Sequence, residues 1–151
     1  MLQARGSAGE AIEEYQLALA LRPGDATVEN ALGAALLASN QISEAILHLS
    51  AAASARPDYF DAHYNLGIAQ GTAGNFSAAV QELTTAVNLN PNDAGAHASL
   101  GAAYAGARRN RASDFAFQSS PGNRSKQRAG ERKSGHFAQR LLASLNSELM
   151  L

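Results

Sequence analysis

Apolar side chains recur at helical spacing over two neighbouring stretches in the middle of the chain, residues 61–70 and 77–89. Residues three and four apart lie on one face of an α-helix, so this spacing is typical of amphipathic helices with one buried face. The apolar positions are Ala62, Leu66 and Ala69 in the first stretch and Ala79, Val80, Leu83, Ala86 and Val87 in the second. The pattern predicts two helices joined by a short turn.

This helix pair recurs along the chain with a period of 34 residues. The prolines Pro23, Pro57 and Pro91 stand at that interval. Three further sets follow it: Leu32-Gly33, Leu66-Gly67 and Leu100-Gly101; Ala11, Ala45 and Ala79; and Ala18, Ala52 and Ala86. So many coincidences exclude chance, and the chain is therefore predicted to consist of repeated helix pairs.

The predicted helix ends carry residues that suit helix termini. Glycine or asparagine readily adopts the left-handed conformation that follows a helix, and the predicted turn residues between the two helices are Gly6, Asn40 and Gly74. Each proline ends a second helix, because it cannot donate a backbone hydrogen bond and disfavours helical geometry in the residue before it. The residues predicted to cap the next helices are Asp25, Asp58 and Asp93.

With Leu66-Gly67 on the first helix, Ala79 on the second and the closing Pro91, the chain resembles the tetratricopeptide repeat family. The resemblance covers roughly residues 6–107. It implies an all-α fold, an α-solenoid of antiparallel helix pairs that coil into a right-handed superhelix, followed here by a degenerate basic tail. The chain departs from the family's preferred tryptophan at Glu29, His63 and His97, and from its tyrosine at Leu36 and Gln70 but not at Tyr104.

The repeat frame predicts the organisation of the chain. Residues 1–25 form a partial repeat that supplies a second helix, 26–59 and 60–93 are full repeats, and 94–118 are a partial or degenerate repeat. Within the last of these, a turn is expected at Arg108 and a short second helix over 111–118. A flexible basic linker over 119–135 and an amphipathic C-terminal helix over 136–151 follow, the helix covering an exposed end of the stack.

The recurring glycines have a mechanical reason. A residue without a side chain lets the second helix of a unit approach the first closely, and these residues are Gly33, Gly67 and Gly101. A larger side chain at such a position is expected to cost about 1 to 3 kcal/mol through overpacking.

Charge divides the chain in two. Ten acidic residues stand against three basic ones up to Ala107, and nine basic residues against three acidic ones from Arg108 onward. We interpret the basic tail as a solvated segment, with attraction to the acidic repeats as an alternative. Few aromatic residues accompany its cations, so nucleic-acid binding is not expected.

Composition and motifs exclude several function classes. The chain has no cysteine, and it lacks a nucleophile elbow, a phosphate loop and a His-Glu-x-x-His motif. His63 and His97 occupy equivalent positions, but two imidazoles without a third ligand make a poor metal site. Neither an enzyme nor a metal or other cofactor is expected. Without a recognisable signal peptide or membrane span, the protein is expected to be soluble and cytoplasmic.

The family resemblance implies a binding groove along the first helices. Carried over by matching positions, its residues are Asn30, Ala34, Leu37, Asp61, Tyr64, Asn65, Ile68, Ala98, Ser99 and Ala102. An apolar floor with acidic surroundings favours an apolar or basic segment of a protein or peptide partner. Asn65 has no asparagine at the equivalent positions Ala31 and Ser99, so an asparagine ladder is not expected.

Two functions fit these features. The first is a scaffold that binds a peptide or a partner helix in the groove. The second is a structural segment of a larger or self-associating repeat protein that has no ligand of its own.

Overall fold

The computed structural model describes residues 2–119, 139–140 and 143–144, and all regular structure among them is helical. The helices are α1 (Leu2–Leu21), α2 (Ala26–Ala38), α3 (Ile42–Ala55), α4 (Phe60–Thr72), α5 (Phe76–Leu89) and α6 (Ala94–Ser119). The chain divides into two units, residues 1–108 and 109–151. The first unit contains the repeats, and the second contains the last part of α6.

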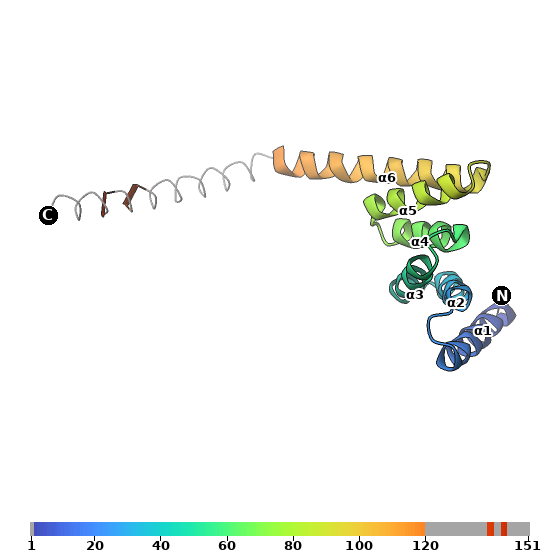
Figure 1. Cartoon of the computed structure of the whole chain (residues 1–151). Coiled ribbons are helices and arrows are strands. Elements are labelled where there is room, and N and C mark those ends of the chain that lie inside the picture. Colours follow the sequence, from blue (N-terminus) through green and yellow to red (C-terminus); the bar gives the residue numbers. More distant parts are fainter. Residues whose placement is uncertain (1, 120–138, 141–142, 145–151) are drawn as a thin grey trace. The chain divides into compact units, whose positions relative to one another are not determined.

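Antiparallel helix pairs stack one on the next within the first unit (Figure 1). Helix α2 pairs with α3 and α4 pairs with α5, while α1 packs on α2 and α3 packs on α4. The all-α solenoid predicted from the 34-residue period is confirmed.

Two apolar clusters hold the stack together. The first lies among α2, α3 and α4 and consists of Leu32, Leu36, Ala45, Leu49, Ala52, Ala53, Ala62, Leu66 and Ala69. Three side chains of α1, Ile12, Tyr15 and Leu19, pack against it. The second consists of Ala79, Leu83 and Ala103, with Tyr64, Val80 and Leu100 against it, and joins α4, α5 and α6. Alanine supplies much of both clusters, so the helices lie close together.

The helix ends agree with the local sequence at most positions. Each of α1, α3 and α5 ends two residues before a proline, and the turns after α2 and α4 contain Asn40 and Gly74 in the left-handed conformation, with φ of 62° and 82°. The amides of Gln41 and Asn75 then close these turns on Leu36 O and Gln70 O. Gly6 is different: it lies inside α1, so the predicted turn there is wrong.

Two of the three predicted aspartate caps are formed. Asp25 accepts hydrogen bonds from the amides of Thr27 and Val28, and Asp93 accepts one from the amide of Ala96. Asp58 does not cap, because Tyr59 precedes α4 and that end has no side-chain cap hydrogen bond. The sequence pattern misplaced this cap by one residue, since Tyr59 is the position equivalent to Asp25 and Asp93.

Helix α6 continues through the turn expected at Arg108 and ends at Ser119, so a separate short helix over 111–118 is not formed. Arginine is a good helix former and adopts the left-handed conformation only at a cost, so nothing in the local sequence ends the helix there. The predicted linker 119–135 lies outside the described residues apart from Ser119. Of the predicted C-terminal helix 136–151, only 139–140 and 143–144 are described, and these are helical.

The close approach predicted at the recurring glycines holds at two of the three positions. A Cβ atom on Gly33 would lie 2.5 Å from Leu49 Cγ, and one on Gly67 would lie 2.5 Å from Leu83 Cγ. A Cβ on Gly101 would meet nothing within 4 Å. The prediction for Gly101 is wrong because α6 does not turn back to place a second helix against it.

Candidate functional site

The predicted groove residues lie on α2, α4 and the first part of α6, and α2 contacts α4 directly. Most of them are partly accessible: Ala34, Leu37, Tyr64, Asn65, Ile68 and Ser99 are half-buried, and Asp61, Ala98 and Ala102 are exposed. Asn30 is the exception, with 8% of its surface exposed. The face formed by α2, α4 and residues 94–107 of α6 is called the first-helix face below.

Asn30 belongs to a chain of polar contacts that links α2 to α4. The Nδ2 atom of Asn65 donates a hydrogen bond to Asn30 Oδ1 over 3.0 Å, and Asn30 Nδ2 donates to the hydroxyl of Tyr59 over 3.3 Å. The guanidinium of Arg56 lies 4.4 Å from the centroid of the Tyr59 ring. Asn30 is therefore mostly buried and holds the amide of Asn65 in place.

This contact was missed because Asn30 and Asn65 are 35 residues apart, one more than the repeat period. Comparison at the 34-residue interval aligns Asn65 with Ala31, so it gave no reason to expect a hydrogen bond between Asn65 and Asn30. Tyr59 and Arg56 carried no sequence signal beyond their nearness to Pro57.

Tyr64 has a structural role as well as an accessible side. Its ring stacks on Phe60 with the ring centroids 5.8 Å apart, and it packs against the second apolar cluster. A Cβ on Gly95 would lie 3.4 Å from the Tyr64 hydroxyl, so the beginning of α6 passes close to this ring.

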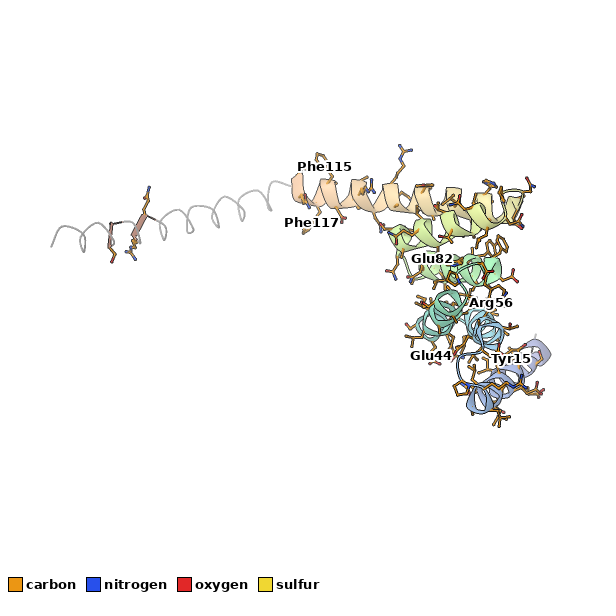
Figure 2. The ribbon with its side chains drawn as sticks, viewed as in Figure 1. Tyr15, Glu44, Arg56, Glu82, Phe115 and Phe117 are labelled. Carbon is orange, nitrogen blue, oxygen red and sulfur yellow. The ribbon has the colours of Figure 1, made fainter. Side chains whose placement is uncertain are left out.

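Each full repeat contains a histidine–glutamate pair between its two helices. In the first, His48 Nδ1 lies 2.7 Å from Glu29 Oε2, and in the second, His63 Nδ1 lies 2.7 Å from Glu82 Oε2. Glu82 is labelled in Figure 2. The residues of each pair are 19 apart, but the order is reversed, with glutamate on the first helix in one repeat and histidine in the other.

These pairs show what the side chains of His48 and His63 contact. His63 also places Nε2 3.0 Å from the carbonyl oxygen of Pro57, so both ring nitrogens face acceptors. His48 is paired with Glu29 in the same way. Among the described residues, no group of three or more histidine, aspartate or glutamate side chains could hold a metal ion.

The first-helix face has no cationic side chain. Helices α2 and α4 and residues 94–107 of α6 contain no lysine and no arginine. Glu29 is paired with His48, so the exposed acidic group on this face is Asp61. The face therefore combines half-buried apolar side chains, the amide of Asn65 and one free carboxylate.

A separate depression of about 620 Å³ lies between α1 and the turn that joins α2 to α3. Its lining consists of Ala8, Gly9, Ile12, Ala38, Ser39, Asn40 and Gln41. None of the predicted groove residues lines it. In the described part of the chain, no helix combines the length and apolar character needed to cross a membrane.

Antiparallel helix pairs, close-approach glycines and a repeat of 34 residues define this part of the molecule as an α-helical repeat array. Residues 36–104 match the family model described as "Tetratricopeptide repeat". Residues 36–104 therefore carry tetratricopeptide repeats. No curated protein matches the chain.

Solved structures with the same fold are similar to the array. They include the first tetratricopeptide domain of Spaghetti (RPAP3) bound to the HSP90 peptide SRMEEVD, with a TM-score of 0.64 and 19% identity over 67% of this chain and 80% of that chain. The second such domain of human RPAP3 in complex with the HSP70 peptide SGPTIEEVD has a TM-score of 0.63 and 24% identity over 67% and 84%. The Sgt2 domain from Aspergillus fumigatus has a TM-score of 0.67 and 22% identity over 72% and 74%.

Proposed function

We propose that the first-helix face binds an extended peptide or a helix of a partner protein, and that the chain is a binding scaffold rather than an enzyme. The observation that carries this proposal is the held amide of Asn65. Its bond to Asn30 uses one of two amide hydrogens, which leaves the second hydrogen and the oxygen for a peptide backbone. An amide already fixed in orientation loses little entropy when it binds.

The charge of the face supports a particular class of peptide. The peptides named for the two RPAP3 domains both end in Glu-Glu-Val-Asp and are acidic. On this chain the first-helix face offers no lysine or arginine to such a peptide, and Asp61 would repel it. An apolar or basic segment meets neither problem, so we infer that the partner has that character.

Binding of synthetic peptides tests this proposal. Short peptides that share a leucine-rich scaffold and carry lysines, glutamates or neither are labelled with a fluorophore and titrated with the 151-residue chain, with binding followed by fluorescence anisotropy. SRMEEVD serves as the acidic reference. The lysine and uncharged peptides are expected to bind and the acidic ones are not.

Two matched variants locate the site. Asp61→Lys on α4 is expected to weaken binding of the lysine peptide. Glu44→Lys on α3 makes the same change in net charge and is expected to leave that binding unchanged. Glu44 is labelled in Figure 2. Asn65→Ala is expected to weaken every binding peptide about 2- to 10-fold through the loss of a hydrogen bond. Tighter binding of the acidic peptides, or equal effects of the two lysine substitutions, would contradict the proposal.

A further inference from the structure

The inward-facing positions of α1 are more exposed than the same positions of the other second helices. Ala45, Leu49 and Ala52 of α3 are all 0% exposed, and their counterparts Ala79, Leu83 and Ala86 of α5 are 0%, 1% and 0% exposed. The equivalent residues of α1 are only half-buried, and they are Ala11, Tyr15 and Ala18. Helix α1 thus leaves partly uncovered the face that α3 and α5 bury against a first helix, although Tyr15 also packs against the first apolar cluster; Tyr15 is labelled in Figure 2.

Helix α6 presents the complementary face. Gly33 and Gly67 are covered by Leu49 and Leu83 of a second helix, whereas Gly101 is exposed with open space above it. Tyr104 is 52% exposed, while its counterpart Leu36 is 1% exposed. Among the described residues, α6 therefore has the surface of a first helix with no second helix packed on it.

His97 repeats the geometry of His63 without the carboxylate. Its Nε2 atom lies 2.8 Å from the carbonyl oxygen of Pro91, as His63 Nε2 lies near Pro57 O. His63 Nδ1 then meets Glu82, but Nδ1 of His97 has no partner among the described residues. The residue of α1 that stands at the position of Glu82 and His48 is Glu14, which is exposed.

Both end helices also run through the position where a repeat normally turns. Helix α1 has 20 residues and α6 has 26, compared with 14 in α3 and α5, and they continue through Gly6 and Arg108. Their charges are opposite in sign, with three glutamates and one arginine on α1 and three arginines and one aspartate on α6.

From these matching surfaces we propose that α6 of one copy pairs with α1 of a second copy, head to tail, and so completes a repeat between chains. In the register of the full repeats, Tyr15 of the second copy covers Gly101, and Glu14 of the second copy meets His97 Nδ1. The small residues Ala11 and Ala18 allow the same close approach as their counterparts in α3 and α5. No connecting turn is needed between two chains, which suits helices that continue past the turn position.

The pairing surfaces of α1 and α6 differ, so each copy keeps one free surface and the assembly grows beyond a dimer unless it closes into a ring. This property separates the proposal from a symmetric contact between two α6 helices. It also separates it from coverage of α6 by another part of the same chain, which gives a monomer.

Sedimentation velocity of the 151-residue chain over a range of concentrations tests the proposal. The mean mass is expected to rise with concentration, and to rise less in high salt because the end helices attract each other by charge. Gly101→Leu is expected to keep the chain monomeric, since a Cβ atom at this position has no described residue within 4 Å and the added side chain blocks the second copy. Circular dichroism checks that this variant keeps its helices. A wild-type chain that stays monomeric at every concentration would overturn the proposal.

A charge exchange tests the register. His97→Glu places two carboxylates together and is expected to weaken self-association by roughly fivefold or more. Adding Glu14→His to that variant is expected to restore association, because Glu29 and His48 show that the fold accepts the reversed order. Equal association of the single and double variants would contradict the proposed register.

Mixing two blocked variants tests the head-to-tail arrangement. Gly101→Leu blocks α6, and Ala11→Arg blocks α1 at a half-buried position where a long side chain reaches solvent. Each variant alone is expected to remain a monomer, and an equimolar mixture is expected to stop at a dimer. A mixture that remains monomeric, or either variant assembling alone, would exclude this arrangement.

Discussion

At the scale of single residues, the two histidine–glutamate pairs show that one position pair can be filled in either order. Glu29 with His48 and His63 with Glu82 have the same 2.7 Å separation, although the acid and the imidazole exchange helices. The pairs lie where the family prefers tryptophan on the first helix. Each pair is a hydrogen bond between an imidazole and a carboxylate that joins the two helices of a repeat.

Exchange of one pair tests this equivalence. His63→Glu brings two carboxylates together and is expected to lower the free energy of unfolding by about 1 kcal/mol, and Glu82→His is expected to have an effect in the same direction. The double variant, with the order found in the preceding repeat, is expected to regain most of the loss. Urea unfolding in dilute solution measures all three, and additive losses in the double variant would show that the pair is not coupled.

At the scale of helices, the ends are set by a few local residues. Prolines follow the second helices, left-handed Asn40 and Gly74 end the first helices, and aspartates precede α2 and α6. Where the sequence has Arg108 in place of a glycine or asparagine, the helix continues. The same local chemistry therefore explains both the hairpins in the repeats and the long α6.

Removal of the caps distinguishes the three aspartates. Asp25→Ala and Asp93→Ala each remove a side chain that accepts from helix amides, and each is expected to cost about 0.5 to 2 kcal/mol of stability. Asp58→Ala is the matched control, because Tyr59 stands between Asp58 and α4, and a change below about 0.5 kcal/mol is expected. Thermal unfolding followed by circular dichroism measures the differences, and an equal loss at Asp58 would contradict the observed helix start.

At the scale of the molecule, stability comes from contacts between neighbouring pairs. The first apolar cluster includes residues of α2, α3 and α4 and is covered by α1, so no helix pair buries its apolar face alone. Repeat arrays of this kind are stabilised by the interfaces between adjacent units. Loss of one buried contact is therefore expected to lower the stability of the whole array.

Truncation of a shared core residue tests this expectation. Leu66 is 4% exposed and belongs to the first cluster, so Leu66→Ala is expected to cost about 2 to 5 kcal/mol. Leu47 on α3 is 70% exposed, and Leu47→Ala is expected to change stability by less than about 0.5 kcal/mol. Urea unfolding followed by circular dichroism and by tyrosine fluorescence should give one shared transition for each variant. Separate transitions would show that the pairs unfold independently.

The amino-acid sequence by itself determined the features that depend on short-range physics. Apolar spacing predicted paired helices over the full repeats, and Asn40, Gly74 and the prolines predicted where those helices end, because backbone preferences act within a few residues. The 34-residue period then predicted the stacking, since such helices bury their apolar faces only against neighbouring pairs.

Only the tertiary structure decided which side chains meet. Asn30 supports Asn65 because α2 and α4 lie side by side, and a residue of one helix there meets a residue that is not its equivalent in the repeat. Such a contact between helices leaves no trace in local spacing. Gly101 and Gly67 carry the same local signal, but Gly67 is covered by Leu83 and Gly101 is open. The difference arises from whether a second helix returns to pack there, and that depends on the path of the chain beyond the glycine.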